Sequence, residues 1–328
     1  MIRPAMPQDM ASIVALLTQD ARERSALDPL LWRIAADAPD RIERAVGAAL
    51  TGHRAPAREL WFVAQHADRI VGVTHAMLVP VPPIYDAAGP PGLLLDDCFV
   101  SAEAPSGTAE ALLAATEAAL TTAGALLLIA SCPAAGRLRP LYERHGYEPV
   151  TLYMAKHRLR REALSPSVRM AGAEDVPGIV NRSAEHRRTL ARINPRFWHI
   201  HPDADSRFEA WMRRSLTFRD RDMLLATAEG EVRGYVITQA IAPLLVPAAH
   251  DITAIGVIDD FYDEDFADIS AVSTDASSCA NLLAAAETAF ARRAIDSALV
   301  VCPAGWSSKI SLLEQSAYRT AKLWMLRH

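Results

Sequence analysis

The sequence predicts two tandem copies of one α/β domain, the first over residues 1–160 and the second over residues 168–328. Three observations support this prediction. The chain has 328 residues, roughly twice the length of a common domain. Several segments recur at a nearly constant offset. Both halves also show the same order of hydrophobic patterns, and with 51% hydrophobic residues each half can bury a core of its own.

The internal repeat is clearest in the second part of each copy. Residues 111–120, ALLAATEAAL, match residues 281–290, NLLAAAETAF, at an offset of 170 (281 minus 111). Offsets of 166 to 171 relate three further pairs: Ile2 and Val168, Cys132 and Cys302, and Leu141 and Leu312. Offsets that drift by a few residues indicate small loop insertions between two related copies.

Each element of the first copy follows from its local pattern. Alternating apolar residues predict strands, and an Ala/Leu-rich stretch predicts a long helix. A first helix begins near Asp9, whose carboxylate favours the N-terminal end of a helix, and Gly146 ends a later one. The predicted strands are 2–4, 60–65, 70–79, 93–100, 126–131 and 149–156, and the later helices are 107–123 and 138–144.

The second copy repeats this order after a short linker. A charged run that meets Ser165-Pro166-Ser167 separates the copies, so residues 161–167 are the predicted linker. Strands are expected at 168–170, 223–228 and 232–240, with a helix beginning near Asp175. A turn at Glu229-Gly230 should join the last two strands into a hairpin, as Asp68-Arg69 does in the first copy.

Charge and composition exclude several kinds of partner. The net charge of −5 offers no basic surface for a phosphate backbone, so no nucleic-acid partner is expected. The N-terminus lacks an apolar segment behind a basic start, and the most apolar run, 125–130, is too short to span a bilayer. We expect a cytoplasmic monomer or homodimer with no membrane partner. The four cysteines form no CxxC pair and should be reduced and buried.

Three motifs of the first copy point to one family. They are Leu95-Asp96-Asp97-Cys98-Phe99-Val100, the loop APSGTAEALL at 104–113, and Leu141-Tyr142-Glu143-Arg144-His145-Gly146-Tyr147. With the order β-α-β-β-β-α-β-α-β, they resemble the GCN5-related N-acetyltransferase (GNAT) superfamily, which commonly carries Leu-Tyr-x-x-x-Gly-Phe/Tyr near its end. The resemblance covers nearly the whole chain, because each of the two copies shows it. It implies an α/β (α+β) fold in which each domain has a mixed, mostly antiparallel twisted sheet flanked by helices.

The resemblance also implies a function and a cofactor site. The family transfers an acetyl group from acetyl-CoA to an amine without a metal, so a small-molecule amine is the expected acceptor. Backbone N–H groups at the start of a helix suit the CoA pyrophosphate. The strand 93–100 would hold the thioester arm where it separates from strand 126–131. The implied cofactor-binding residues are Phe99, Val100, Ser106, Gly107, Thr108 and Ala109.

Three catalytic candidates follow from the same motifs. Tyr142 matches the family's general acid for the CoA sulfur, although a packed helix tyrosine is the alternative. Asp96 is the implied base. Asp97 is adjacent to it, so on a strand the two carboxylates point to opposite faces and cannot both line one site. Either could instead attract an amine or cap a loop.

The second copy keeps less of the expected site. Its loop at 274–279 has no glycine, Asp275 would face the phosphate, and Leu313 replaces the family's tyrosine. Together with Pro105 in the first loop, this leaves a second hypothesis: a non-catalytic acyl-CoA-binding or protein-interaction module. The segment from His199 to Asp205 carries two histidines and two aspartates but lacks the adjacent acid–histidine pair of metallo-hydrolases, so we expect no metal there.

Overall fold

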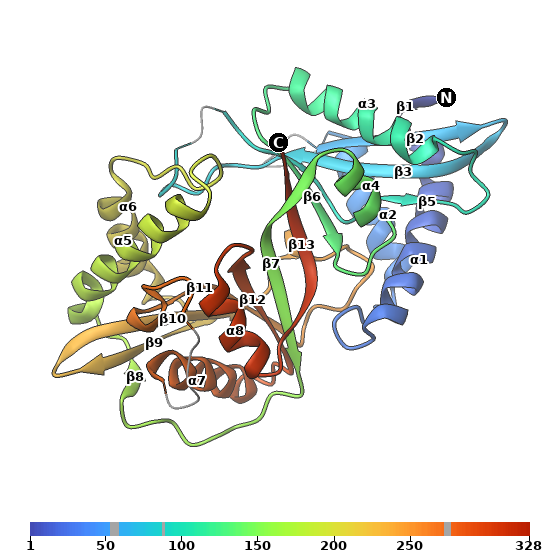
Figure 1. Ribbon diagram of the computed structural model, residues 1–328. Helices are drawn as coiled ribbons and strands as arrows, with labels where there is room; N and C mark the ends of the chain where they lie inside the picture. Colours follow the sequence, from blue (N-terminus) through green and yellow to red (C-terminus); the bar gives the residue numbers. More distant parts are fainter. Residues whose placement is uncertain (53–58, 87–88, 272–276) are drawn as a thin grey trace.

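Figure 1 shows the computed structural model of the chain, which describes residues 1–52, 59–86, 89–271 and 277–328. The N-terminal half contains β1 (Ile2–Pro4), α1 (Met10–Leu27), α2 (Ala38–Leu50), β2 (Glu59–His66), β3 (Arg69–Leu78), β4 (Gly92–Leu94), β5 (Phe99–Val100), α3 (Thr108–Thr122), β6 (Leu128–Pro133), α4 (Arg139–Arg144) and β7 (Tyr147–His157). Most of these elements lie where the hydrophobic pattern predicts them. Helix α2 was not among the predicted elements.

The C-terminal half repeats this order. It contains β8 (Val168–Met170), α5 (Val176–Ile193), α6 (Ala204–Ser215), β9 (Arg221–Ala228), β10 (Glu231–Ala240), β11 (Ile255–Asp263), α7 (Ser278–Arg292), β12 (Ser297–Pro303), α8 (Ser307–Gln315) and β13 (Arg319–Arg327). Short 3₁₀ turns lie at η1 (Pro7–Asp9), η2 (Ala173–Asp175), η3 (Pro243–Leu245) and η4 (Glu264–Phe266). The predicted turn at Glu229-Gly230 joins β9 to β10, and both residues have positive φ, which is typical of a type I′ hairpin.

The strands form one sheet of mixed direction. Its order is β1-β2-β3-β4-β6-β13-β7-β12-β11-β10-β9-β8, with β5 paired to β3. The pairs β4–β6 and β11–β12 are parallel, whereas the other strand pairs are antiparallel. The expected fold class, mixed and mostly antiparallel with flanking helices, is therefore confirmed.

Helices cover both faces of the sheet in the N-terminal half (Figure 1). Val63 of β2 belongs to a core cluster with Ile13 of α1 and Ile42 of α2. The next residue, Ala64, packs with Leu112 of α3 in another cluster. Successive strand residues point to opposite faces, so the two helical layers divide the apolar residues of β2 between them. All four cysteines are buried, as predicted.

The last strands of the two halves are exchanged, which corrects our expectation that strand 149–156 closes its own unit. β7 pairs with β12 of the C-terminal half, and β13 pairs with β6 of the N-terminal half. β7 and β13 also pair with each other at the centre of the sheet, where Figure 1 shows them crossing the molecule side by side. The exchange is possible because both strands carry similar apolar patterns, so either can complete either half.

A second correction concerns the strand expected at 93–100. It is broken into β4 and β5, and residues 95–98 bulge out between them. β3 pairs Ala76 with Leu94 and Val73 with Phe99, so five steps along one strand oppose three along the other. The bulge turns Asp96 away from the regular ladder, and the N–H of Cys98 donates to the Asp96 carbonyl over 2.8 Å.

Within the parts of the chain that the structure describes, no helix combines the length and the apolar character needed to cross a membrane.

Candidate functional site

The candidate site lies where two neighbouring strands separate. β4 pairs with β6 only from Gly92 to Leu94, and beyond this point β5 pairs with β3. β6 continues to Pro133 beside β13. A cavity of about 220 Å³ lies at this separation, with Phe99, Val100 and Ser131 in its wall. This is the divergence that the resemblance implies for the thioester arm.

Asp96 lines this cavity within a network of charges. It is 4% exposed and forms ion pairs with Lys322 Nζ and, over 3.5 Å, with Arg24 Nη1. Ser131 Oγ donates to Asp96 Oδ2 over 3.1 Å. Burial alone would raise the pKa of Asp96, but the two cations outweigh burial and lower it. A carboxylate held ionised in this way is a weak base, which weakens the case for Asp96 as the catalytic base.

Lys322 is supplied by the exchanged strand. It belongs to β13 of the C-terminal half, yet its Nζ meets Asp96 of the N-terminal half and also donates to the carbonyl of Leu245 over 2.6 Å. Its side chain is 2% exposed. The N-terminal site is therefore completed by a residue from the other end of the chain.

Asp97 has a different set of partners from Asp96, although its charge still acts on Asp20 and Arg24 of α1. Its Oδ2 lies 3.3 Å from His75 Nδ1, and Glu59 Oε2 lies 3.2 Å from His75 Nε2. Burial lowers the pKa of His75, but the two carboxylates outweigh burial and raise it. His75 also stacks on Trp61 with ring centroids 3.9 Å apart. Asp97 thus orients a histidine on the face of β3 that packs against α1.

Tyr142 lies in α4 on the other side of residues 98–100. It is 2% exposed and lines a narrow crevice of about 10 Å³ with Phe99, Val100 and Ala109. Burial raises the pKa of Tyr142 well above its usual value, so the phenol stays protonated at neutral pH. The crevice holds little more than one water molecule, so it must widen before a pantetheine arm can reach Tyr142.

Arg137 crosses the gap between the separated strands. Its Nη2 donates to the Val100 carbonyl, and its guanidinium lies 4.9 Å from the centre of the Phe99 ring. Arg137 Nη1 also pairs with Glu23 Oε2 of α1 over 3.1 Å. Because Arg137 is half exposed, its side chain can swing out and release the Val100 carbonyl.

The predicted pyrophosphate loop forms the start of α3. Gly107 is the N-cap residue at φ +81°, a left-handed conformation that glycine adopts without strain. Ser106 precedes it in the loop, and Thr108 Oγ1 donates to the Pro105 carbonyl over 2.6 Å. Thr108 and Ala109 open the helix, where backbone N–H groups and the helix dipole favour an anion.

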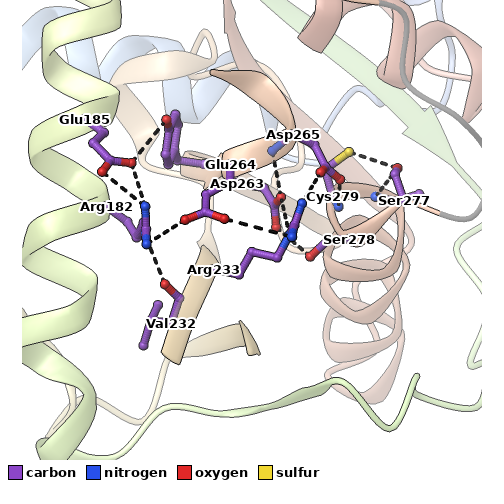
Figure 2. Close-up of polar contacts among 12 residues, drawn as sticks. Arg182, Glu185, Val232, Arg233, Asp263, Glu264, Asp265, Ser277, Ser278 and Cys279 are labelled. Carbon is purple, nitrogen blue, oxygen red and sulfur yellow. Dashed lines mark hydrogen bonds and ion pairs between the residues drawn. The ribbon is translucent and has the colours of Figure 1, made fainter. Parts of the chain in front are cut away.

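The corresponding helix start in the C-terminal half is occupied by its own side chains (Figure 2). Ser278 Oγ donates to Asp263 Oδ2 over 2.7 Å, and the N–H of Cys279 donates to Asp265 Oδ2 over 3.3 Å. Arg233 Nη2 pairs with Asp265 over 2.5 Å. A phosphate would meet these carboxylates at the first turn of α7. The predicted Asp275 lies outside the described residues.

Sequence reasoning missed four charged residues of the N-terminal site: Asp20, Arg24, Arg137 and Lys322. A signal existed for the first two, because Ile13, Leu17, Asp20 and Arg24 follow helical spacing along one stripe of α1. Charges within an apolar stripe are candidates for a site. Arg137 and Lys322 carry no such signal, because their partners depend on the strand exchange and on the loop after β6.

Among the described residues, no group of three or more histidine, cysteine, aspartate or glutamate side chains could hold a metal ion. The segment from His199 to Asp205 meets the N-terminal half where the N–H of Asp86 donates to the His199 carbonyl over 2.7 Å, and within the C-terminal half Asp205 pairs with Arg187 of α5.

Comparisons with known proteins support the fold but not a close relationship. No protein-family model matches the sequence, and no curated protein sequence does. A GCN5-related N-acetyltransferase from Sphaerobacter thermophilus has a similar structure, with 14% identity and a TM-score of 0.56 over 100% of this chain and 95% of that one. A tandem GNAT protein from the clavulanic acid biosynthesis pathway shares 13% identity, with a TM-score of 0.51 over 99% of this chain and 97% of that one.

A third similar structure contains a GCN5-related glucosamine N-acetyltransferase region within a fungal multi-domain GH3 beta-N-acetylglucosaminidase. It shares 12% identity, with a TM-score of 0.53 over 99% of this chain and 38% of that one. At such identities the likeness concerns the fold alone. The separated strands, the two similar halves and the full-length match to a tandem protein together identify this chain as one with the tandem GNAT fold.

Proposed function

We propose that the protein is an acetyl-CoA-dependent N-acetyltransferase whose working site lies in the N-terminal half. The observation that carries this proposal is the arrangement around residues 98–100. The segment is bordered by the crevice of Tyr142 on one side and by a charged cavity on the other, and both are lined by Cys98, Phe99, Val100 and Leu138. A thioester on this segment would have a proton donor and an acceptor cavity on opposite sides.

The proposed cofactor site follows the exposed backbone of this half. The pyrophosphate would bind the N–H groups of Ser106, Gly107, Thr108 and Ala109 at the start of α3. The pantetheine arm would then run along Phe99 and Val100 and replace Arg137 at the Val100 carbonyl. Acetyl-CoA would supply the acetyl group as a thioester.

The proposed chemistry is direct attack of an amine on the thioester carbonyl. Tyr142 would donate a proton to the departing CoA sulfur, which suits a phenol that stays protonated at neutral pH. Asp96 would then serve as a fixed negative charge that positions Arg24 and Lys322, because its low pKa suits an ion pair better than proton abstraction.

The C-terminal half, residues 168–328 after a linker at 161–167, is proposed as a supporting unit. Its helix α7 begins against Asp263 and Asp265, and burial raises the pKa of Asp263 to about 6. Leu313 stands at the position of Tyr142 and is fully buried. In this proposal the C-terminal half contributes Lys322 to the working site and has no working site of its own.

The alternative, a non-catalytic acyl-CoA-binding or protein-interaction module, is favoured by one observation. Arg137 covers the Val100 carbonyl, and the crevice of about 10 Å³ beside Tyr142 is closed to a pantetheine arm in this conformation. If Arg137 does not move, acetyl-CoA cannot reach Tyr142.

Two measurements on the full chain separate these functions. Calorimetric titration with acetyl-CoA should give one site per chain, and a thiol-reactive dye should report CoA release when a primary amine is added. Tyramine, spermidine, glucosamine and lysine form a suitable first panel. Binding without CoA release for every amine would support the non-catalytic module, and two equivalent sites would contradict the proposed asymmetry. Absence of acetyl-CoA binding would refute both the enzyme and the acyl-CoA-binding module, and would leave the protein-interaction module.

A further inference from the structure

Asp20 is a carboxylate on α1 that faces the cavity at the strand separation. Its side chain is 13% exposed and lines the cavity of about 220 Å³ together with Phe99 and Val100. Arg24 Nε donates to Asp20 Oδ2 over 2.7 Å. Among the residues that the structure describes, no donor lies within hydrogen-bonding distance of Oδ1. One oxygen is fixed and the other can meet a ligand.

The charges around Asp20 make it a better proton acceptor than Asp96. Burial raises the pKa of Asp20 to about 6, Arg24 opposes this shift, and the negative charges of Asp97 and Asp96 add to it. Asp96, in contrast, is held by Lys322 and Arg24 and has a lowered pKa. Two further charges, Glu23 and Arg137, line the same cavity and pair with each other. Asp20 is therefore the carboxylate of this site that can both exchange protons near neutral pH and contact a ligand.

The position of Asp20 relative to Tyr142 suits an acid–base pair. Asp20 lines one cavity and Tyr142 lines the other, and the two cavities share residues 98–100. A thioester carbonyl held on this segment would have its sulfur toward Tyr142 and its carbonyl carbon open to an amine from the side of Asp20.

The C-terminal half keeps a titratable side chain at the matching helix position. The offset of 166 that relates Ile2 to Val168 also relates Asp20 to His186. His186 Nδ1 lies 3.0 Å from Asp260 Oδ1, in the Asp–Asp pair of β11. Both halves thus place a proton-exchanging group of the first long helix near the Asp–Asp segment. In the C-terminal half the histidine is 7% exposed, and the rings of Tyr262 and Trp306 pack against it with centroids 5.4 Å away.

We propose that Asp20 binds the acceptor as a cationic primary amine and takes its first proton, which makes Asp20 the catalytic base of the reaction. This inference rests on the proposed function. The ammonium form of the acceptor gives one proton to Asp20, and the free amine attacks the acetyl carbon. A C–N bond forms as the C–S bond breaks, the thiolate receives one proton, and the nitrogen loses its second proton. Asp20 later returns its proton to solvent, so acetyl-CoA and the ammonium yield amide, CoA thiol and one proton.

The cavity also limits the acceptor. About 220 Å³ accommodates the aminoalkyl end of a small molecule. A larger cavity of about 690 Å³ adjoins it through shared residues Leu27, Pro133 and Ala135, and would take the remainder of the acceptor. We therefore expect a small amine with an unbranched amino end.

The kinetic test compares Asp20→Asn, Asp20→Glu and a control, Glu43→Gln, which removes an exposed carboxylate from α2. With the best amine of the panel, Asp20→Asn should lower kcat by about 100- to 10,000-fold and abolish the acidic limb of the pH profile near pH 6. Asp20→Glu should retain more activity, and Glu43→Gln should match the parent. Unchanged kcat and an unchanged acidic limb in Asp20→Asn would overturn the proposal.

A second measurement does not depend on turnover. Amine binding to the CoA complex is measured by calorimetry at pH 6 in two buffers of different ionisation enthalpy. Binding of an ammonium should release up to about half a proton per site, since Asp20 with a pKa near 6 is half protonated there. Asp20→Asn should release none. Equal proton release in the parent and in Asp20→Asn, or no amine binding at all, would refute the role of Asp20. If the parent does not bind acetyl-CoA, the proposed function itself is refuted.

Discussion

The exchange of the last strands makes a strong prediction about Lys322. Lys322→Met removes the buried cation that meets Asp96 Oδ2 and leaves Asp96 with Arg24 at 3.5 Å as its remaining ion-pair partner. Removing one member of a buried ion pair costs about 3–5 kcal/mol, because the other charge stays buried without compensation. A chain of 328 residues has an unfolding entropy of about 0.7 kcal/mol/K, so Tm should fall by about 4–7 °C if the chain unfolds as one unit.

The assay is thermal unfolding at pH 7 for four proteins: the parent, Lys322→Met, Asp96→Asn and the double variant. If the two side chains interact as the structure shows, the double variant should be more stable than the sum of the single effects predicts, by about 1–3 kcal/mol. Lys156→Met is the matched control. Lys156 lies on β7 and pairs with Glu287 over 2.6 Å, but it is 27% exposed, so its loss should cost about 1 kcal/mol or less.

The pH dependence of Tm tests the sign of the contribution that Asp96 makes to stability. The folded pKa of Asp96 lies below its unfolded value of about 3.9, so its ion pairs stabilise the parent above that pH and are lost as the pH falls through the folded pKa. In Lys322→Met the pKa of Asp96 should rise, so the deficit in Tm should shrink between pH 7 and pH 5. A loss below 1 kcal/mol at pH 7, or no coupling in the double variant, would refute the contact between the exchanged strand and Asp96.

Four further outcomes are expected. Tyr142→Phe should lower kcat by about 10- to 1,000-fold with acetyl-CoA affinity unchanged; a parent-like kcat with rate-limiting chemistry would make Tyr142 a packing residue. Gly107→Asp should abolish acetyl-CoA binding in calorimetry, while Gly107→Asn, which has the same backbone strain at φ +81° but no charge, should retain part of it. Leu313→Ala should cost about 2–5 kcal/mol in denaturant unfolding without changing activity per folded molecule; lost turnover in a folded variant would move the working site to the C-terminal half. The pKa of His75 is raised, so protonated His75 stabilises the fold below pH 6.5, and this contribution is lost as the pH rises through the folded pKa. Protonated His75 stacked on Trp61 should quench its fluorescence, so the difference in fluorescence between the parent and Trp61→Phe should grow only above pH 6.5.

Much of this protein could be predicted from local patterns. The repeat offset predicts two similar halves, and alternating apolar residues predict β2, β3, β9 and β10 nearly to the residue, because burial of one sheet face requires a period of two. The start of α3 at Thr108 after Gly107 follows from backbone chemistry that the loop sequence displays directly. Such features depend on neighbours along the chain, which a sequence contains in full.

Other features depend on which segments meet in space. The pattern of residues 149–156 predicts a strand, but β6 and β12 offer it equivalent edges, so its partner could not be chosen from the sequence. The place of Lys322 beside Asp96 depends on that choice.

Asp96 shows most clearly what the sequence could not predict. Its motif suggests a base, whereas its pKa is set by two cations, Arg24 and Lys322, that lie 72 and 226 residues away along the chain (96 minus 24 and 322 minus 96). The sequence by itself determined the internal repeat, most of the strands and the loop suited to an anion. The tertiary structure alone decided that Asp96 is held by two cations whereas Asp20, within the described part of the chain, pairs with Arg24 alone, because charge–charge interactions depend on distance in space and on burial.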